Sequence, residues 1–406
     1  MKTHITPNAL ALRSASIVGE KADHHDAWLV LRDGVIDAIL PEAPAGVPAI
    51  DLGDIRIAPG LIDVHIHGRD GHDVMDATPA ALDGISRSLA RHGITSFLAT
   101  TVTAGWERTL AALDVIGARQ GGSAMPGARL LGAYSEGLFF CCEHRGAHNP
   151  DFFLQPSVER VEAMIAAARG SLKVIALAPE IEGAMPALRH AVEKGVRVVL
   201  GHTDATYDQT RSALAAGASG GVYLFNGMRG IHHREPGCAG ALLLERCTVE
   251  VIADGVHLHP AILSLIARLK PANDILLISD CMCAGGLDDG RYRLGEMDVT
   301  VTGGVARTDG GGLAGSTLTL DRAVAHLVEA GDVAFRDAIH MASLYPARFA
   351  NVDDRYGSIA TGKAADLVLL DPAGMVMATL VGGRLVYVVN DWEIATRLST
   401  LASPEA

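Results

Sequence analysis

The sequence predicts an α/β fold: a (β/α)8 barrel (TIM barrel) with a small β-sandwich domain built from both termini. Three observations predict it. In the middle of the chain, eight short apolar runs alternate with segments of helical periodicity. Both ends of the chain read instead as strands joined by turns. Most of the eight apolar runs finish in a polar or ionisable residue, as strands do at the active face of such a barrel.

The N-terminal part of the predicted sandwich covers residues 1–57. A run of strand-forming residues at 27–31 leads into Asp33 and Gly34, a favoured pair for a tight hairpin turn. A second short apolar run, 35–36, follows the turn at once. This segment therefore predicts at least one β-hairpin.

The C-terminal part of the predicted sandwich covers residues 357–406. Two strands are expected there, at 365–371 and within 375–389, with a Gly-Gly turn inside the second segment. Because the two ends of a chain often meet in space, we expect both segments to form one sandwich beside a barrel at 58–356.

The first βα unit of the barrel shows the pattern most clearly. Thr78 is expected to cap a helix that starts at Pro79, and Gly93 is expected to end it before the next strand. Predicted strands are 61–67, 95–101, 128–134, 173–178, 196–201, 219–225, 248–253 and 274–280. Predicted helices elsewhere in the ring include 158–168, 185–193, 206–215, 320–330 and 334–344.

Composition restricts the class of protein. The chain has 406 residues, 49% of them hydrophobic and 20% charged, so a large core is expected. The formal charge is −13 and no cluster of Lys and Arg occurs, which argues against a nucleic-acid partner. An anionic substrate would therefore need a local basic pocket.

The location of the protein is expected to be cytoplasmic. The first 18 residues contain no apolar segment typical of a signal peptide, and no apolar run approaches the ~20 residues that span a membrane. The six cysteines show no disulfide-scaffold pattern in a chain of this length, so we expect reduced thiols.

Two histidines end the first predicted barrel strand. His65 and His67 are two residues apart, so on a strand both imidazoles point to the same side and can share one ion. A pair of this kind can also arise by chance on a surface. Its position at the end of a barrel strand favours metal binding.

Three further strand ends carry ionisable groups. Glu136 follows the third strand, His202 ends the fifth and Asp280 ends the eighth. Taken alone, each could be structural; Glu136 in particular could form an ordinary salt bridge. Together with the histidine pair they predict a metal-dependent hydrolase, with Asp280 as general base towards water.

Several motifs resemble those of the amidohydrolase superfamily and, within it, the deacetylases of N-acetylated amino-sugar 6-phosphates. Residues 59–68, Pro-Gly-Leu-Ile-Asp-Val-His-Ile-His-Gly, resemble the superfamily's entry strand. The resemblance covers nearly the whole chain, and further matching segments are 73–78, 145–150, 178–180, 201–206, 226–228, 233–237, 252–257 and 315–319. Three segments look closer to the N-acetylgalactosamine-6-phosphate branch than to the N-acetylglucosamine-6-phosphate branch: 230–237, 289–292 and 338–344.

The resemblance implies a role for each matching residue. Glu136 and His202 match metal ligands, His65 and His67 match the second-metal pair of some members, and Asp280 matches the catalytic aspartate. It implies a divalent metal, with zinc expected, as one or two ions. It also implies a homodimer, since the residue matching Arg234 reaches the neighbouring subunit's substrate. The residues that match sugar-phosphate contacts are Ala147, His148, Asn226, Gly227, Arg234, His257, Leu313, Ala314 and Gly315.

One position departs from the family pattern at the expected metal site. Tyr223 stands where the family has a histidine ligand beside Glu136 and His202. Three interpretations remain open. Tyr223 could bind the ion as phenolate, the ion could lie mainly with His65, His67, Glu136 and Asp280, or the site could be weakened. Cys281 and Cys283, which follow the aspartate, also depart from the family; we interpret them as buried thiols rather than replacement ligands.

The sequence thus predicts metal-dependent deacetylation of an N-acetylated amino-sugar 6-phosphate, with the galactosamine form favoured and acetate released. Two alternatives stay open. One is an amidohydrolase that acts on a different N-acyl amine or on a cyclic amide. The other is a metal-depleted protein that only binds a sugar phosphate, which Tyr223 would favour and the intact Asp280 would not.

Overall fold

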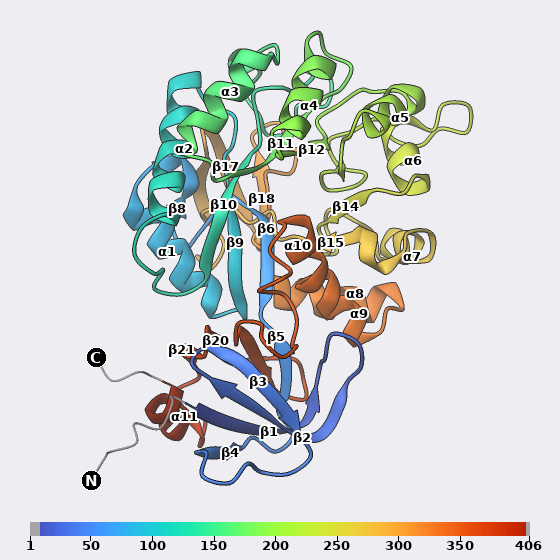
Figure 1. Cartoon of the computed structure of the whole chain (residues 1–406). Helices are drawn as coiled ribbons and strands as arrows, with labels where there is room; N and C mark the ends of the chain where they lie inside the picture. Colours follow the sequence, from blue (N-terminus) through green and yellow to red (C-terminus); the bar gives the residue numbers. More distant parts are fainter. Residues whose placement is uncertain (1–8, 403–406) are drawn as a thin grey trace.

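A computed structural model describes residues 9–402 and shows two main bodies, a barrel and a smaller β domain in which both described ends of the chain lie (Figure 1). The β domain is one sheet of eight strands in the order β21-β20-β19-β5-β1-β2-β3, with β4 paired to β1. Its strands are β1 (Ala9–Ile17), β2 (His24–Arg32), β3 (Val35–Leu40), β4 (Ala49–Asp51), β5 (Arg56–Pro59), β19 (Leu367–Leu370), β20 (Val376–Val381) and β21 (Arg384–Val388).

The β domain joins the two ends of the chain through backbone pairing. Strand β19 from the C-terminal segment runs antiparallel to β5, with Val368 opposite Ala58. The predicted hairpin turn is present, because Asp33 and Gly34 both have positive φ (51° and 79°) between β2 and β3. The domain boundaries 1–57, 58–356 and 357–406 remain predictions, and residues 1–8 and 403–406 lie outside the described part.

The barrel is a parallel sheet of eight strands in chain order, β6 to β15, with helices outside (Figure 1). Its strands are β6 (Leu61–Ile66), β9 (Ile94–Thr100), β10 (Arg129–Ser135), β11 (Leu172–Leu177), β12 (Arg197–Leu200), β13 (Gly220–Gly221), β14 (Thr248–Val251) and β15 (Ile275–Leu277). The α/β fold class, a (β/α)8 barrel with a β domain built from both termini, is therefore confirmed.

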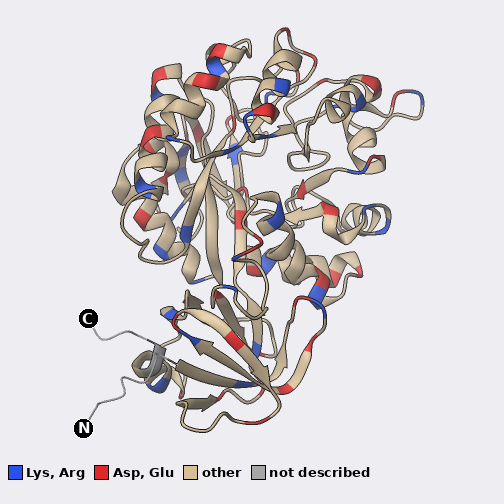
Figure 2. Cartoon of the chain, viewed as in Figure 1, with Lys and Arg blue, Asp and Glu red and all other residues tan. Residues whose placement is uncertain are grey.

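Helices surround the barrel and cap its ends. They are α1 (Pro79–Ala90), α2 (Trp106–Gln120), α3 (Val158–Ala167), α4 (Ala184–Glu193), α5 (Tyr207–Ala215), α6 (Gly237–Leu244), α7 (Pro260–Leu269), α8 (Leu320–Gly331), α9 (Phe335–Met341) and α10 (Leu344–Phe349), with α11 (Ala395–Ala402) against β21. Short 3-10 helices occupy η1 (Val74–Asp76), η2 (Pro150–Phe152) and η3 (Ala272–Asp274). Residues of both charge signs are scattered over the outer helices (Figure 2). Within residues 9–402, every helix is too short or too polar to cross a bilayer.

Two predicted elements differ in the structure. The strand expected at 219–225 is regular only over Gly220–Gly221, although Val222 N–H still donates to the Leu200 carbonyl and Leu224 N–H to the Glu250 carbonyl. A Cβ at Gly220 would lie 1.8 Å from the carbonyl oxygen of Thr248, so this pairing requires glycine. The helix expected at 334–344 ends earlier, at Met341, because Ser343 has non-helical backbone angles and separates α9 from α10, which begins at Leu344.

The predicted first helix has the expected cap. Thr78 Oγ1 accepts a hydrogen bond from the backbone N–H of Ala81, and Pro79 is the first helical residue. The helix buries Leu82, Ile85 and Leu89 against the barrel, which fixes the return to β9 and hence the position of β6 beside it.

A small sheet that we did not predict from the sequence lies after the last barrel strand. It is antiparallel and consists of β16 (Gly290–Leu294), β17 (Met297–Thr302) and β18 (Val305–Thr308). Elsewhere, after the first barrel strand, β7 (Gly68–Arg69) and β8 (His72–Asp73) form a two-stranded ribbon. Leu294, Val299 and Val301 pack with Val102 and Met282 into a separate apolar cluster. This cluster holds the inserted sheet beside the carboxyl ends of the barrel strands.

Candidate active site

The predicted strand-end residues converge at the carboxyl end of the barrel. His65 lies in β6 and His67 directly after it, while Glu136, His202 and Asp280 follow β10, β12 and β15. All five side chains are buried, with exposed fractions between 0% and 7%. Residues separated by more than 200 positions in the chain therefore share one site.

Four ligand-type atoms face one another at the centre of the site. His67 Nε2 lies 3.1 Å from Glu136 Oε2 and 3.1 Å from Asp280 Oδ1. His65 Nε2 lies 3.6 Å from each of the same two oxygens. A second group, formed by Glu136, His148 and His202, also has the spacing of metal ligands. The site thus offers two places where imidazoles and carboxylates could hold an ion.

Two of these residues have a backbone that only the folded structure can maintain. His202 has a φ of 46° and Asp280 a φ of 50°, the left-handed region that non-glycine residues rarely adopt. Such strain is typical of functional sites, where surrounding contacts impose it. Here it directs both side chains into the mouth of the barrel instead of along their strands.

Hydrogen bonds from behind orient the three imidazoles. His65 Nδ1 lies 2.7 Å from Glu250 Oε2, and the Nδ1 atoms of His67 and His202 face the carbonyl oxygens of Thr100 (3.2 Å) and His144 (2.7 Å). Because these partners accept, each Nδ1 donates, and each Nε2 presents its lone pair to the site.

Glu250 was missed by the sequence analysis. It lies inside the buried strand β14 between Val249 and Val251, and its exposed fraction is 1%. Its Oε1 accepts a hydrogen bond from the Tyr134 hydroxyl at 3.2 Å. A lone carboxylate within an apolar strand was the available signal, because such a group is seldom buried without a partner.

The electrostatics of the centre favour a positive charge. Burial opposes the charge of His65, but Glu136 and Glu250 outweigh it and raise the pKa of His65 well above its usual value. Against the same cost of burial, Asp280 and Glu136 raise the pKa of His67 to about 10. His65 and His67 in turn hold the pKa of Glu136 well below its usual value despite burial. A cation between these groups would satisfy them all.

The other two imidazoles lie in a different environment. Burial lowers the pKa of His202, and burial together with the closeness of the His202 imidazole lowers the pKa of His148 well below its usual value. His148 Nδ1 lies 2.7 Å from the Thr103 hydroxyl. Both rings are therefore neutral at pH 7 and can accept a hydrogen bond or a metal ion at Nε2.

Tyr223 lies at the boundary between the two groups. Its hydroxyl contacts both Glu136 Oε1 and His202 Nε2, which are 3.8 Å apart. Burial, and then the carboxylates of Glu136 and Asp280, raise the pKa of Tyr223 well above its usual value. The phenol is therefore held in its neutral form by the surrounding residues.

A cavity of about 260 Å³ opens over this site. Of the predicted substrate-contact residues, those that line it are Ala147, His148, Asn226, Gly227, His257, Leu313 and Gly315. His67, Glu136, His202, Tyr223 and Asp280 form its floor. The cavity therefore combines the candidate metal ligands with polar groups that can bind a small molecule.

Two predicted contact residues do not line the cavity within this chain. Ala314 is fully buried in the apolar cluster of the inserted sheet. Arg234 is exposed on the loop before α6, where its Nη1 lies 2.7 Å from His233 Nε2. Neither residue is brought into the same pocket as Asp280 by the fold of one chain.

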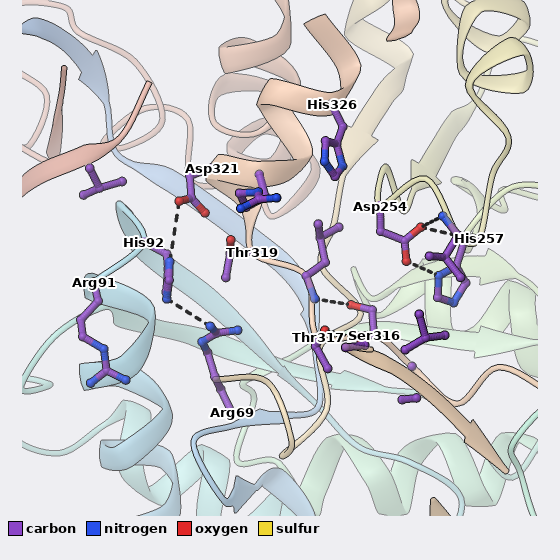
Figure 3. A pocket seen from close by; sticks show the side chains of 18 of the residues that line it. Arg69, Arg91, His92, Asp254, His257, Ser316, Thr317, Thr319, Asp321 and His326 are labelled. Carbon is purple, nitrogen blue, oxygen red and sulfur yellow. Dashed lines mark hydrogen bonds and ion pairs between the residues drawn. The ribbon is translucent and has the colours of Figure 1, made fainter. Parts of the chain in front are cut away.

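A larger cavity of about 740 Å³ adjoins the first, and His257, Leu313 and Gly315 line both. Figure 3 shows His257 held by Asp254, whose Oδ2 lies 2.6 Å from His257 Nδ1. On the opposite side, His92 connects Arg69 to Asp321, with Arg69 Nη2 3.1 Å from His92 Nε2. His257 thus stands between the two cavities with its ring fixed.

The cysteines near the site are not arranged as ligands. Cys281 is fully buried, and burial raises its pKa to about 11; burial does the same for Cys283. Cys281 Sγ receives a weak hydrogen bond from Arg69 at 3.4 Å. Neither thiol lines the cavity over Asp280. All six cysteines are free in the described part of the chain.

The residues present fit a divalent metal. His65 Nε2 is completely buried and has no hydrogen-bond partner among the described residues, although it points at two carboxylates. A buried polar atom without a partner is costly, and an ion between these groups would remove the cost. Two imidazoles and carboxylate oxygens are a common donor set of catalytic metal sites.

Comparison with known proteins identifies the family. The model of the amidohydrolase family matches residues 56–386. The chain is 46% identical to the N-acetylgalactosamine-6-phosphate deacetylase of Escherichia coli O157:H7, over 92% of this chain and 98% of that protein. It is 42% identical to the N-acetylglucosamine-6-phosphate deacetylase of Vibrio furnissii, over 94% and 96%.

Solved structures agree with this assignment. The fold matches the N-acetyl-D-glucosamine-6-phosphate deacetylase of Mycobacterium smegmatis in complex with N-acetyl-D-glucosamine-6-phosphate, with a TM-score of 0.88 and 34% identity over 94% of this chain and 100% of that one. The family implies a divalent metal, and the two groups of ligands described above could hold one. The chain therefore belongs to the amidohydrolase family, in its branch of N-acetylhexosamine-6-phosphate deacetylases, and is an amide-hydrolysing enzyme.

Proposed function

We propose that the enzyme removes the acetyl group of an N-acetylated amino-sugar 6-phosphate, with N-acetylgalactosamine 6-phosphate favoured over N-acetylglucosamine 6-phosphate. The observation that carries the proposal is the convergence of His65, His67, Glu136 and Asp280 under a cavity of about 260 Å³. The greater identity to the Escherichia coli relative supports the galactosamine form.

The predicted metal ligands are His65, His67, Glu136 and His202, and the donor set suits zinc. A bound zinc ion would polarise the acetyl carbonyl and make water more acidic. Asp280, whose Oδ1 faces His67, then takes the proton of the attacking water as general base. Asp280 delivers this proton to the amide nitrogen, so that the amine leaves in a protonated, stable form and acetate is released.

The remaining cavity residues hold the sugar phosphate. His148 and His257 present ring nitrogens to the cavity, and Asn226, Gly227, Ala147 and the segment Leu313, Ala314 and Gly315 complete its wall or support it. Arg234 lies outside the cavity of its own chain, which is consistent with a homodimer in which it reaches the partner's phosphate. A guanidinium binds phosphate with two parallel hydrogen bonds. With six free thiols, we also propose a cytoplasmic location.

The test is an amine-release assay of the purified enzyme on both N-acetylhexosamine 6-phosphates. We expect acetate release from both sugars and a higher kcat/KM for the galactosamine form. The reverse order would overturn the preferred epimer only. No release from either sugar, together with turnover of an unphosphorylated N-acyl amine or a cyclic amide, would show a different amidohydrolase reaction. No turnover and no bound metal would show a sugar-phosphate binding protein.

A further inference from the structure

The position of the Tyr223 hydroxyl decides which part of the site can hold an ion. Glu136 Oε1 and His202 Nε2 are 3.8 Å apart, and the hydroxyl contacts both. Two ligands of one zinc ion, each bonded at about 2.1 Å, stand about 3.4 Å apart in a tetrahedral site. The gap between Glu136 and His202 therefore has the width of a metal position, but the hydroxyl already lies in it.

The geometry excludes a phenolate ligand at this place. In a tetrahedral site, the distance between any two ligand atoms is about the same, so a phenolate oxygen would lie about 3.4 Å from each of the other ligand atoms. The Tyr223 oxygen instead contacts both Glu136 Oε1 and His202 Nε2 directly and donates its single proton to one of these two acceptors, which leaves no room for an ion among the three atoms. The oxygen of a tyrosine lies farther from the backbone than the Nε2 atom of a histidine. The Tyr223 oxygen therefore occupies the ion position itself, whereas Nε2 of a histidine would lie beside it.

The other side of Glu136 remains open and has the spacing of a complete site. The distances from His67 Nε2 to Glu136 Oε2 and Asp280 Oδ1 are both 3.1 Å, and those from His65 Nε2 to the same oxygens are both 3.6 Å. These values bracket the edge of about 3.4 Å for a tetrahedral zinc site. One ion at the centre would contact all four atoms.

The hydrogen bonds behind the histidines point to the same place. His65 Nδ1 donates to Glu250 and His67 Nδ1 donates to the Thr100 carbonyl, so that both Nε2 lone pairs face Glu136 and Asp280. In the neutral form of both rings, which is the form that binds a metal ion, four acceptor atoms converge without a donor among them, and His65 Nε2 has no partner in the described residues. Such a group of buried acceptors requires a cation.

Taken together, these contacts give an ion count for the enzyme. We propose that the chain binds a single divalent ion between His65, His67, Glu136 and Asp280, and that the Tyr223 hydroxyl takes the place of a second ion between Glu136 and His202. This assignment revises the ligand set predicted from the sequence, because His202 is then a hydrogen-bonding residue and not a metal ligand. The inference rests on the proposed metal-dependent function, but it concerns the number and place of the ions and not the substrate.

The test is the zinc content of the enzyme and four variants, measured by elemental analysis after chelation and reloading, with calorimetric titration of Zn²⁺ for affinity. We expect one ion per chain in the natural enzyme and two in Tyr223→His, which removes the hydroxyl and adds an imidazole. His67→Ala should lose the ion, whereas His202→Ala should keep it. Tyr356→Phe, a buried tyrosine that packs against Arg129 instead, serves as the packing control and should keep one ion.

Several outcomes would overturn the inference. Two ions in the natural enzyme, one ion in a folded Tyr223→His variant, or loss of the ion from His202→Ala with retention in His67→Ala would each do so. If Tyr223→His does not fold, anomalous diffraction at the zinc edge from crystals of the natural enzyme locates the ion directly. A peak between Glu136 and His202 would contradict the assignment, and a single peak beside His65 and His67 would support it.

These measurements separate the two proposals. An enzyme that binds one ion beside His65 but releases no acetate from either sugar phosphate would leave this inference intact and overturn the proposed function. An enzyme that deacetylates the sugar phosphate with two ions per chain would support the proposed function and overturn this inference.

Discussion

The backbone N–H of Asp280 donates a hydrogen bond to the carbonyl oxygen of His65 at 3.0 Å, which joins the end of the last barrel strand to the first. The next residues continue the seam, since His67 N–H donates to the Cys281 carbonyl at 2.9 Å. Below them, the Asp63 carboxylate accepts a hydrogen bond from the Ser279 hydroxyl at 2.5 Å. Asp280 and the histidine pair are thus fixed to each other by the bonds that close the barrel.

Replacing Asp280 by asparagine tests its role as proton carrier. The amide keeps the size of the side chain but cannot take a proton from water. We expect kcat to fall by about 10²- to 10⁴-fold, the usual contribution of a general base. Steady-state kinetics on both sugar phosphates measure the effect, with unchanged thermal unfolding and an unchanged zinc content as the controls for the fold and the ion. An unaltered kcat would remove Asp280 from the mechanism.

Replacing Arg234 by alanine tests the phosphate contact across a dimer. We expect KM for a 6-phosphorylated substrate to rise by about 10- to 100-fold, the equivalent of one or two charge-assisted hydrogen bonds. The KM for the unphosphorylated sugar should not change. Arg246→Ala, another exposed arginine, is the matched control. Equal effects on both sugars would contradict the assignment.

Glu250 is expected to act through His65. The negative charge of Glu250 orients the His65 ring and raises the pKa of His65. Replacing Glu250 by glutamine removes this charge, and we expect zinc affinity to fall by about 10- to 100-fold. Calorimetric titration of Zn²⁺ measures this, with the partly exposed Glu245→Gln as the control. An affinity equal to that of the natural enzyme would mean that Glu250 has only a packing role.

An ion pair with a buried carboxylate joins the barrel to the β domain. Asp366 accepts two hydrogen bonds from Arg129, at 2.6 and 3.2 Å, and its side chain is only 3% exposed. Asp366→Asn leaves the guanidinium without its charge partner, so we expect a loss of about 3 kcal/mol in the free energy of unfolding. Denaturant titration measures it. Asp114→Asn removes the similar but exposed pair with Arg169 and should have little effect.

Stability near Glu20 should depend on pH. A hydrogen bond from Ser358, and another from Lys363, hold the pKa of Glu20 below 4.5 against partial burial. A lowered carboxyl pKa stabilises the fold above the unfolded value, and the contribution disappears as pH falls through the folded value. Glu20→Gln should therefore cost about 1 kcal/mol or less at pH 7, because solvent screens the pair, and the difference should shrink as pH falls below 4.5 through the lowered pKa of folded Glu20.

The Glu20 prediction has an internal control. Lys363→Gln should reproduce part of the loss, and the double variant should lose less than the sum of the two single variants, since both remove the same contact. Denaturant titrations at pH 7 and below pH 4 give the comparison. A difference that persists unchanged in acid would show that the ionised form of Glu20 is not what stabilises the junction.

The sequence by itself determined the order of the barrel elements. Apolar runs of strand length, a helix cap at Thr78 and a turn at Asp33 and Gly34 are local signals, and each reflects backbone preferences of nearby residues. The eighth strand ended in Asp280 and the first in His65 and His67 for the same local reason. Their common place at one end of the barrel followed from parallel strand topology.

Only the tertiary structure decided which groups touch. Glu250 could not be assigned to His65 because 185 residues separate them, and no local pattern encodes that contact. Position 220 accepts only glycine because the Thr248 carbonyl approaches it from the next strand. The sequence also left three interpretations of Tyr223 open. They differ in where the Tyr223 oxygen lies relative to Glu136 and His202, and only the folded barrel fixes that position.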